Sequence, residues 1–128
     1  MPLYNSFVFK YTLFAVITFL LSASFAFAQT RPSLNTDLQL GDNGSAVRDL
    51  QVFLNNNGFP LSGSGIGSSG QESEYFGPKT LKAVEAFHLQ YKEDVLIPVG
   101  LSSPTGYWGP SSRNKRSEEH TSELQSPD

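Results

Sequence analysis

The sequence predicts an all-α fold, a small domain of three helices preceded by a helical signal segment. Two segments, 47–54 and 81–91, carry apolar residues at intervals of three and four, the spacing of a helix with one packed face. A turn also repeats, because residues 75–78 (YFGP) return as residues 107–110 (YWGP), and Gly followed by Pro is typical of a helix start. A chain of 128 residues has room for one compact domain between its two ends.

The first 28 residues have the pattern of a secretory signal peptide. Lys10 supplies a weak positive start, residues 11–25 are largely apolar, and residues 26–28 (AFA) fit the small-x-small rule for cleavage before Gln29. An uncleaved membrane anchor is the alternative, since the apolar stretch is close to the minimum of about 17 residues that spans a bilayer. Both interpretations place the domain outside the cytoplasm, in the periplasm, the cell wall or the extracellular space. The membrane is a partner only if the segment stays uncleaved.

Residues 29–37 are expected to form a linker and residues 38–115 the domain. The first helix of the domain carries the stripe of segment 47–54, with Ser45 or Asn43 as the candidate cap at its start.

Poor helix formers and a glycine at 55–58 end this helix, and Phe59 then folds back onto the stripe. The stretch 62–70 (SGSGIGSSG) is too small and flexible to offset its conformational entropy by burial, which predicts a mobile surface loop. A linker between two domains is the alternative. We prefer the loop, because the segments on either side are too short to hold separate cores.

The second helix is expected to begin at Pro78 and to close at residues 92–94. A third helix is expected from Pro110, although the apolar residues that would complete its face are missing before Lys115. Residues 116–128 lack apolar periodicity and are expected to form a disordered tail.

This tail has a second peculiarity. Residues 116–126 (RSEEHTSELQS) match the translation of the start of a widely used short-read sequencing adapter, which indicates an assembly artefact. On this interpretation the natural gene continues differently after Lys115, and His120 has no biological role. A genuine polar tail is the alternative.

Composition argues against several classes of function. The net charge is −3 and no window is rich in Lys or Arg, so nucleic acid is not an expected partner. The absence of Cys excludes disulfides and thiolate metal sites, and His88 and His120 stand far apart without an HExxH motif. The acidic residues are scattered, whereas a glycosidase needs a carboxylate pair about 5 to 10 Å apart in a cleft. We therefore expect no enzyme, no metal and no cofactor.

The domain resembles the peptidoglycan-binding domain 1 family. Its pattern is a Leu-Gly lead-in, V-x-x-L-Q-x-x-L, Gly with an aromatic residue, then F-G-x-x-T and A-V-x-x-F-Q. The matching positions are Leu40-Gly41, Val47, Leu50-Gln51, Leu54, Gly58-Phe59, Phe76-Gly77, Thr80, Ala83-Val84 and Phe87. His88 departs from the usual Gln, and the loop 62–70 is longer than a typical connection.

The resemblance implies a compact orthogonal bundle of three helices that is not catalytic and localises proteins at bacterial cell walls. We therefore expect an exported, monomeric domain that binds peptidoglycan, through either its glycan strands or its stem peptides. The alternative is the targeting module of a cell-wall hydrolase, or another peptidoglycan-processing enzyme, whose catalytic domain is missing from this chain. A structural module that has lost its ligand is a third possibility.

A glycan-peptide ligand offers sugar faces, N-acetyl groups and carboxylates, which exposed aromatic rings, amides and Arg can recognise. The candidate ligand-binding residues are Tyr75, Tyr107, Trp108, Arg48 and Gln51. Core packing is the competing interpretation for each aromatic residue and the favoured one for Trp108. A structural hydrogen-bonding role is favoured for Gln51, and a surface or hydrogen-bonded role for His88.

Overall fold

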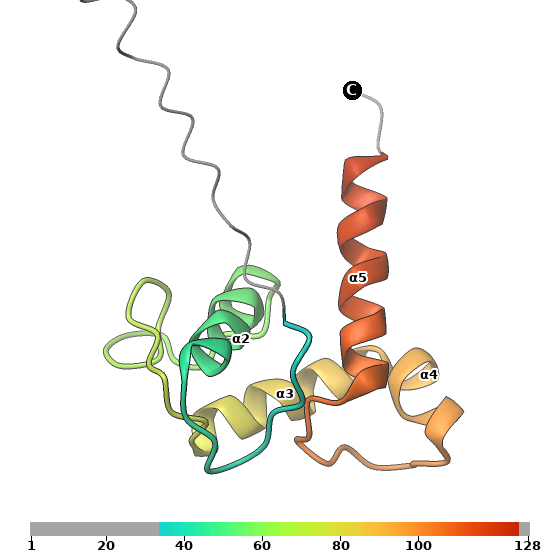
Figure 1. Ribbon diagram of the computed structural model, residues 1–128, viewed down its shortest axis with the longest axis horizontal. Coiled ribbons are helices and arrows are strands. Elements are labelled where there is room, and N and C mark those ends of the chain that lie inside the picture. The colour runs from blue at the N-terminus through green and yellow to red at the C-terminus, as the bar shows by residue number, and fades with distance from the viewer. Residues whose placement is uncertain (1–33, 126–128) are drawn as a thin grey trace, which may run out of the picture. The chain divides into compact units, whose positions relative to one another are not determined.

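The computed structural model describes residues 34–125. The expected signal peptide, residues 1–28, and the first part of the expected linker lie outside the described residues. Within the described range the chain is all-α, as predicted, and forms four α-helices and one 3₁₀ helix without a strand (Figure 1). They are α2 (Ser45–Asn56), α3 (Pro78–Gln90), α4 (Lys92–Val95), η1 (Ile97–Val99) and α5 (Pro110–Leu124). None of these helices is long and apolar enough to cross a membrane.

Glycine residues, and no capping side chains, precede the three longer helices. The expected caps of α2 are wrong, because Gly44 occupies the cap position with a φ of 138° and no side chain caps the helix. The Asn43 amide donates instead to the carbonyl of Gly41, at 3.1 Å. The predicted starts at Pro78 and Pro110 are confirmed, each following a glycine in extended conformation.

The second helix ends earlier than predicted. α3 stops at Gln90, and residues 92–94, which we expected to close it, belong to the separate short helix α4. The break redirects the chain so that Val95 and Leu96 are buried, with 3% and 1% of their surface exposed. Burial of two aliphatic side chains thus outweighs continuation of a helix that is already long enough to cover the core.

The core is centred on the Phe87 ring of α3. Its centroid lies 4.8 Å from that of Tyr91, 5.1 Å from Trp108, 5.3 Å from Phe59 and 6.0 Å from Phe53. The predicted stripe of α2 packs against this cluster, and Phe59 folds back as expected. Aromatic rings from three other segments therefore meet Phe87, together with Tyr91 at the end of α3.

An N-terminal segment, residues 34–44, joins both repeated turns. Leu38 exchanges two backbone hydrogen bonds with Trp108, at 2.8 and 3.1 Å, and the Phe76 amide donates to the carbonyl of Asp42 at 2.9 Å. Leu34, which we had placed in the linker, is 2% exposed and belongs to the core. The packed domain therefore begins before the expected boundary at residue 38.

The expected disordered tail is helical as far as Leu124, within α5. No Gly or Pro interrupts the sequence after Pro110 in this helix, and Lys115 pairs with Glu119 one turn later, at 3.1 Å. Lys115 also binds Asp94 of α4 at 2.9 Å, and these two hydrogen-bonded carboxylates raise the pKa of the lysine. The expectation failed because it used apolar periodicity alone, whereas polar pairs also stabilise a helix. The proposed adapter origin of this segment stays a prediction.

The Gly/Ser loop 62–70, which we expected to be mobile, is hydrogen-bonded to the helices on both sides of it. The Asn55 side chain of α2 donates to the carbonyl of Gly67 at 3.1 Å. Lys79 of α3 donates to Ser62 Oγ and to the carbonyl of Ile66, both at 3.3 Å. The loop is therefore attached to the two helices that it connects.

Truncating the central ring tests this description of the core. We expect Phe87→Ala to lower the free energy of unfolding by about 3 to 5 kcal/mol, because it removes the ring that four aromatic neighbours contact. Leu89→Ala on the same helix is the matched control, since Leu89 is 58% exposed, and it should change the value by less than about 0.5 kcal/mol. Chemical denaturation measures both, and equal effects would contradict the proposed centre.

Candidate functional site

The described domain contains one structural unit twice. Helix α2 carries Val47, Leu50, Gln51 and Leu54. Val84, Phe87 and His88 of α3, with Tyr91 directly after it, have the same spacing. At the equivalent position each helix buries a polar residue, Gln51 in α2 and His88 in α3, with 1% and 2% of their surface exposed. Each of these two residues bonds a hydroxyl in the first turn of a later helix, Gln51 in α3 and His88 in α5.

The two buried hydrogen bonds correspond closely. Gln51 Nε2 donates to Thr80 Oγ1 at 3.0 Å, and His88 Nε2 lies 2.9 Å from Ser112 Oγ. Thr80 stands three residues after the glycine of the first repeated turn, and Ser112 occupies the same place after the second. The pattern Tyr-aromatic-Gly-Pro therefore extends by two positions to a buried hydroxyl.

The turns themselves also match. The ring of Tyr75 lies over Gly77, where an added Cβ would come within 3.1 Å of the ring, and the ring of Tyr107 covers Gly109 even more closely. Ser73 Oγ accepts from the Tyr75 amide at 3.4 Å, as Thr105 Oγ1 does from the Tyr107 amide at 3.3 Å. A side chain at either glycine would displace the ring of the tyrosine two residues earlier, slightly at Gly77 and more at Gly109.

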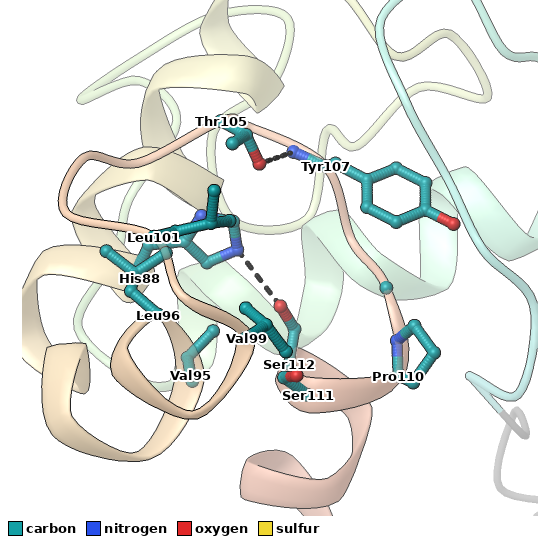
Figure 2. Close-up of a pocket in the computed structure, with 11 residues that line it drawn as sticks. His88, Val95, Leu96, Val99, Leu101, Thr105, Tyr107, Pro110, Ser111 and Ser112 are labelled. Atoms are coloured by element: carbon teal, nitrogen blue, oxygen red, sulfur yellow. Dashed lines mark hydrogen bonds between the residues drawn. The ribbon is translucent and has the colours of Figure 1, made fainter.

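One pocket lies at the start of α3 and another at the start of α5. The larger one, which we call the Lys79 pocket, has a volume of about 410 Å³. The smaller one, the His88 pocket, has a volume of about 220 Å³ and appears in Figure 2. Equivalent positions line both pockets: Gln51 and His88, Ser73 and Thr105, Tyr75 and Tyr107, Gly77 and Gly109, Pro78 and Pro110, Lys79 and Ser111, Thr80 and Ser112.

A cation at its edge distinguishes the Lys79 pocket. The two hydrogen bonds of Lys79 go to neutral oxygens, and within residues 34–125 the lysine makes no ion pair. Tyr75 is 50% exposed beside it. On the pocket floor, the Gln51 side chain bonds the Tyr75 carbonyl at 2.9 Å and the Ser73 amide at 2.8 Å. An unpaired ammonium and a half-exposed ring can together bind a carboxylate that is attached to an apolar group.

The His88 pocket is uncharged. Burial lowers the pKa of His88, although the nearby Tyr107 backbone opposes this effect, so the imidazole is neutral at pH 7. The Tyr107 hydroxyl turns away from the pocket and donates to Asp37 Oδ2 at 2.5 Å (Figure 2). Asp37 also pairs with Arg113 of α5.

The five predicted ligand-binding residues do not lie together at one site in the structure. Tyr75 and Gln51 meet in the Lys79 pocket, where Gln51 is a buried structural residue, as we favoured. Tyr107 borders the other pocket. Trp108 has no exposed surface, so its ring packs in the core and cannot stack on a ligand. Arg48 is exposed on α2 and lines neither pocket.

Sequence reasoning did not name Lys79, Thr80 or Ser112 as residues of a candidate site. The repeated turn was visible, and reading it two residues further would have aligned Thr80 with Ser112. Aligning residues 47–54 with residues 84–91 would also have paired Gln51 with His88. The His at position 88, where the family pattern has Gln, would then have been interpreted as the second copy of one buried polar position.

Comparison of the chain with protein families, with curated proteins and with solved structures finds no match. Among residues 34–125 no group of three or more His, Cys, Asp or Glu side chains is arranged to hold a metal ion.

The buried imidazole predicts a dependence of stability on pH. Its folded-state pKa lies below the unfolded value of about 6.5, so the unfolded chain binds the proton more readily. The stabilisation is complete above pH 6.5, and it is lost as the pH falls from there through the lowered folded pKa, by at most about 1.4 kcal/mol per pH unit.

The variant His88→Gln tests this dependence, because Gln51 shows that an amide can bond the equivalent hydroxyl. We expect it to remove the pH-dependent loss between pH 6.5 and 4.5 that chemical denaturation measures in the unmodified chain. His120→Gln serves as the control and should keep the loss. An identical pH profile for His88→Gln and the unmodified chain would disprove the role of His88.

Proposed function

We propose that this chain is a noncatalytic, exported module that binds bacterial peptidoglycan, and that the Lys79 pocket receives a stem peptide. The main support is the unpaired Lys79 ammonium beside the half-exposed ring of Tyr75. Stem peptides carry carboxylates next to small apolar side chains, and both groups suit this pair. The amides of such a peptide can also reach hydroxyl groups such as that of Ser73 at the pocket wall.

The family resemblance supports the same proposal. The apolar positions that carry it, among them Leu50, Val84 and Phe87, are buried in one core. Its Gln and Thr positions, Gln51 and Thr80, are hydrogen-bonded to each other. We propose on this basis that α2, α3 and α5 correspond to the orthogonal three-helix bundle of the family, with α4 as a short addition.

Location is the third part of the proposal. The signal pattern of residues 1–28 would deliver the domain to the periplasm, the cell wall or the cell exterior, where peptidoglycan is accessible. The alternative is the targeting module of a hydrolase or a related enzyme, whose catalytic domain could lie in the lost sequence if residues 116–126 derive from an adapter. Sequencing the locus past the codon for Lys115 distinguishes the two, since a long reading frame favours the enzyme.

Retention of the full chain on purified cell-wall sacculi tests the binding proposal. We expect the unmodified chain to be retained and Lys79→Ser to bind about ten- to a hundredfold more weakly, because a charge-assisted hydrogen bond contributes about 1.5 to 3 kcal/mol. Lys82→Ser is the matched control, since Lys82 is exposed on the same helix and lies outside the pocket.

Two results would oppose the proposal. If the unmodified chain is retained no better than an unrelated small acidic protein, the binding proposal is wrong. If Lys79→Ser and Lys82→Ser are retained equally, the Lys79 pocket is not the binding site.

A further inference from the structure

We propose that Ile66 determines the specificity of the Lys79 pocket, so that the pocket selects carboxylates whose neighbouring carbon carries an aliphatic side chain. This inference rests on the proposed function for the place and the charge of the ligand. It adds the residue of this chain that distinguishes one carboxylate from another, and its test requires no peptidoglycan.

Lys79 has a donor left for a ligand. A lysine ammonium carries three N–H donors, and those of Lys79 are engaged by Ser62 Oγ and by the carbonyl of Ile66 alone. A carboxylate can therefore bind the remaining N–H without breaking the contact between the ammonium and the loop. The ammonium also sets the charge of the ligand, because within residues 34–125 Lys79 has no acidic partner.

The same lysine holds Ile66 at the edge of the pocket. Its hydrogen bond to the Ile66 carbonyl is 3.3 Å long, and only the carbonyl carbon and Cα separate that oxygen from the side chain. Ile66 lines the pocket together with Leu61 and Tyr75. The cation and the aliphatic side chain thus lie within the reach of a single amino acid. A ligand can meet both, one with its carboxylate and the other with a side chain on the adjacent carbon.

The loop that carries Ile66 is attached on both sides of this residue. Asn55 of α2 accepts from the Leu61 amide at 3.0 Å and donates to the Gly67 carbonyl at 3.1 Å. The same Asn55 side chain donates to the Glu72 carboxylate at 2.8 Å. These bonds hold both flanks of the loop tip against α2.

Internal hydrogen bonds also shape the loop tip. Ser68 donates to the Gly65 carbonyl twice, through its amide at 3.0 Å and its hydroxyl at 2.7 Å. Gly65 and Gly67 have φ values of 69° and 94°, in the left-handed region that favours glycine. Ile66 stands between them and is 74% exposed, more than any other large hydrophobic residue in the described range. The loop therefore holds the backbone of Ile66 and gives its side chain little to pack against.

The surroundings of Ile66 separate it from an ordinary exposed residue. A single exposed aliphatic side chain is common on protein surfaces. Ile66, however, shares one pocket with an unpaired cation, Lys79, and with the half-exposed ring of Tyr75. It is also the only large side chain among residues 62–70, which are otherwise Ser and Gly. A ligand with an aliphatic side chain covers this apolar surface, whereas a ligand without one leaves it in contact with water.

NMR titrations of the full chain with small probes, following the ring signals of Tyr75, test this selectivity. N-acetyl-alanine carries a carboxylate and a methyl group, N-acetyl-glycine carries the carboxylate alone, and N-acetyl-alanine methylamide carries the methyl group without a charge. We expect N-acetyl-alanine to bind about two- to fourfold more tightly than N-acetyl-glycine, because one more carbon is buried. The methylamide should bind more weakly than N-acetyl-alanine, by about tenfold or more.

Variants assign the preference to one side chain. Ile66→Ser conserves the character of the Ser/Gly loop and should bind the two carboxylate probes with equal affinity. Ile97→Ser is the matched control, since Ile97 is 49% exposed and lines neither the Lys79 pocket nor the His88 pocket, and it should keep the preference. Lys79→Ser should weaken both carboxylate probes by about ten- to a hundredfold.

Equal affinities of the unmodified chain for N-acetyl-alanine and N-acetyl-glycine would overturn the inference, as would a preference that survives Ile66→Ser. A lack of saturable binding by both carboxylate probes would overturn it too. Sacculus retention that depends on Lys79, without any preference between the probes, counts against the role of Ile66 alone. A preference that depends on Ile66, without sacculus retention, counts against peptidoglycan as the partner alone.

Discussion

Two buried hydrogen bonds help to fix the positions of α3 and α5 in the described domain. Gln51 with Thr80 ties α2 to the first turn of α3, and His88 with Ser112 ties the last turn of α3 to the first turn of α5. Because a buried polar group without a partner is costly, each bond limits how far the following helix can slide or rotate. The starts of α3 and α5, and with them the two pockets, are therefore positioned by two polar contacts inside an otherwise aromatic and aliphatic core.

The same framework supports two different surfaces because the supporting and ligand-facing positions are separate. Glycine, the covering tyrosine and the buried hydroxyl recur in both units, since each is fixed by a steric or hydrogen-bonding requirement. Lys79 and Ser111 stand at the equivalent ligand-facing position and differ, although Lys79 also bonds the loop 62–70. The two pockets therefore differ in charge on the same framework.

Sequence reasoning found the features that depend on local pattern. The two apolar stripes gave the long helices, and the Gly-Pro pairs gave the starts of α3 and α5. It missed α4 and the burial of Leu34, since both depend on which distant residues leave space in the core. For the site, it named Tyr75 and Gln51 from residue type. Within residues 34–125 Lys79 pairs with no carboxylate, and this is a property of the folded loop that no local pattern encodes.

The N-terminal segment has a consequence for any shortened form of the protein. Residues 34–44 bond the backbones of both aromatic turns, at Trp108 and at Phe76, and contribute Leu34 and Leu38 to the core. Cleavage before Gln29 would leave this segment intact. A protease that trimmed the chain past Leu38 would instead remove the backbone hydrogen bonds to Trp108, just before α5, together with two core side chains, so the tolerance of the domain to N-terminal trimming has a sharp limit.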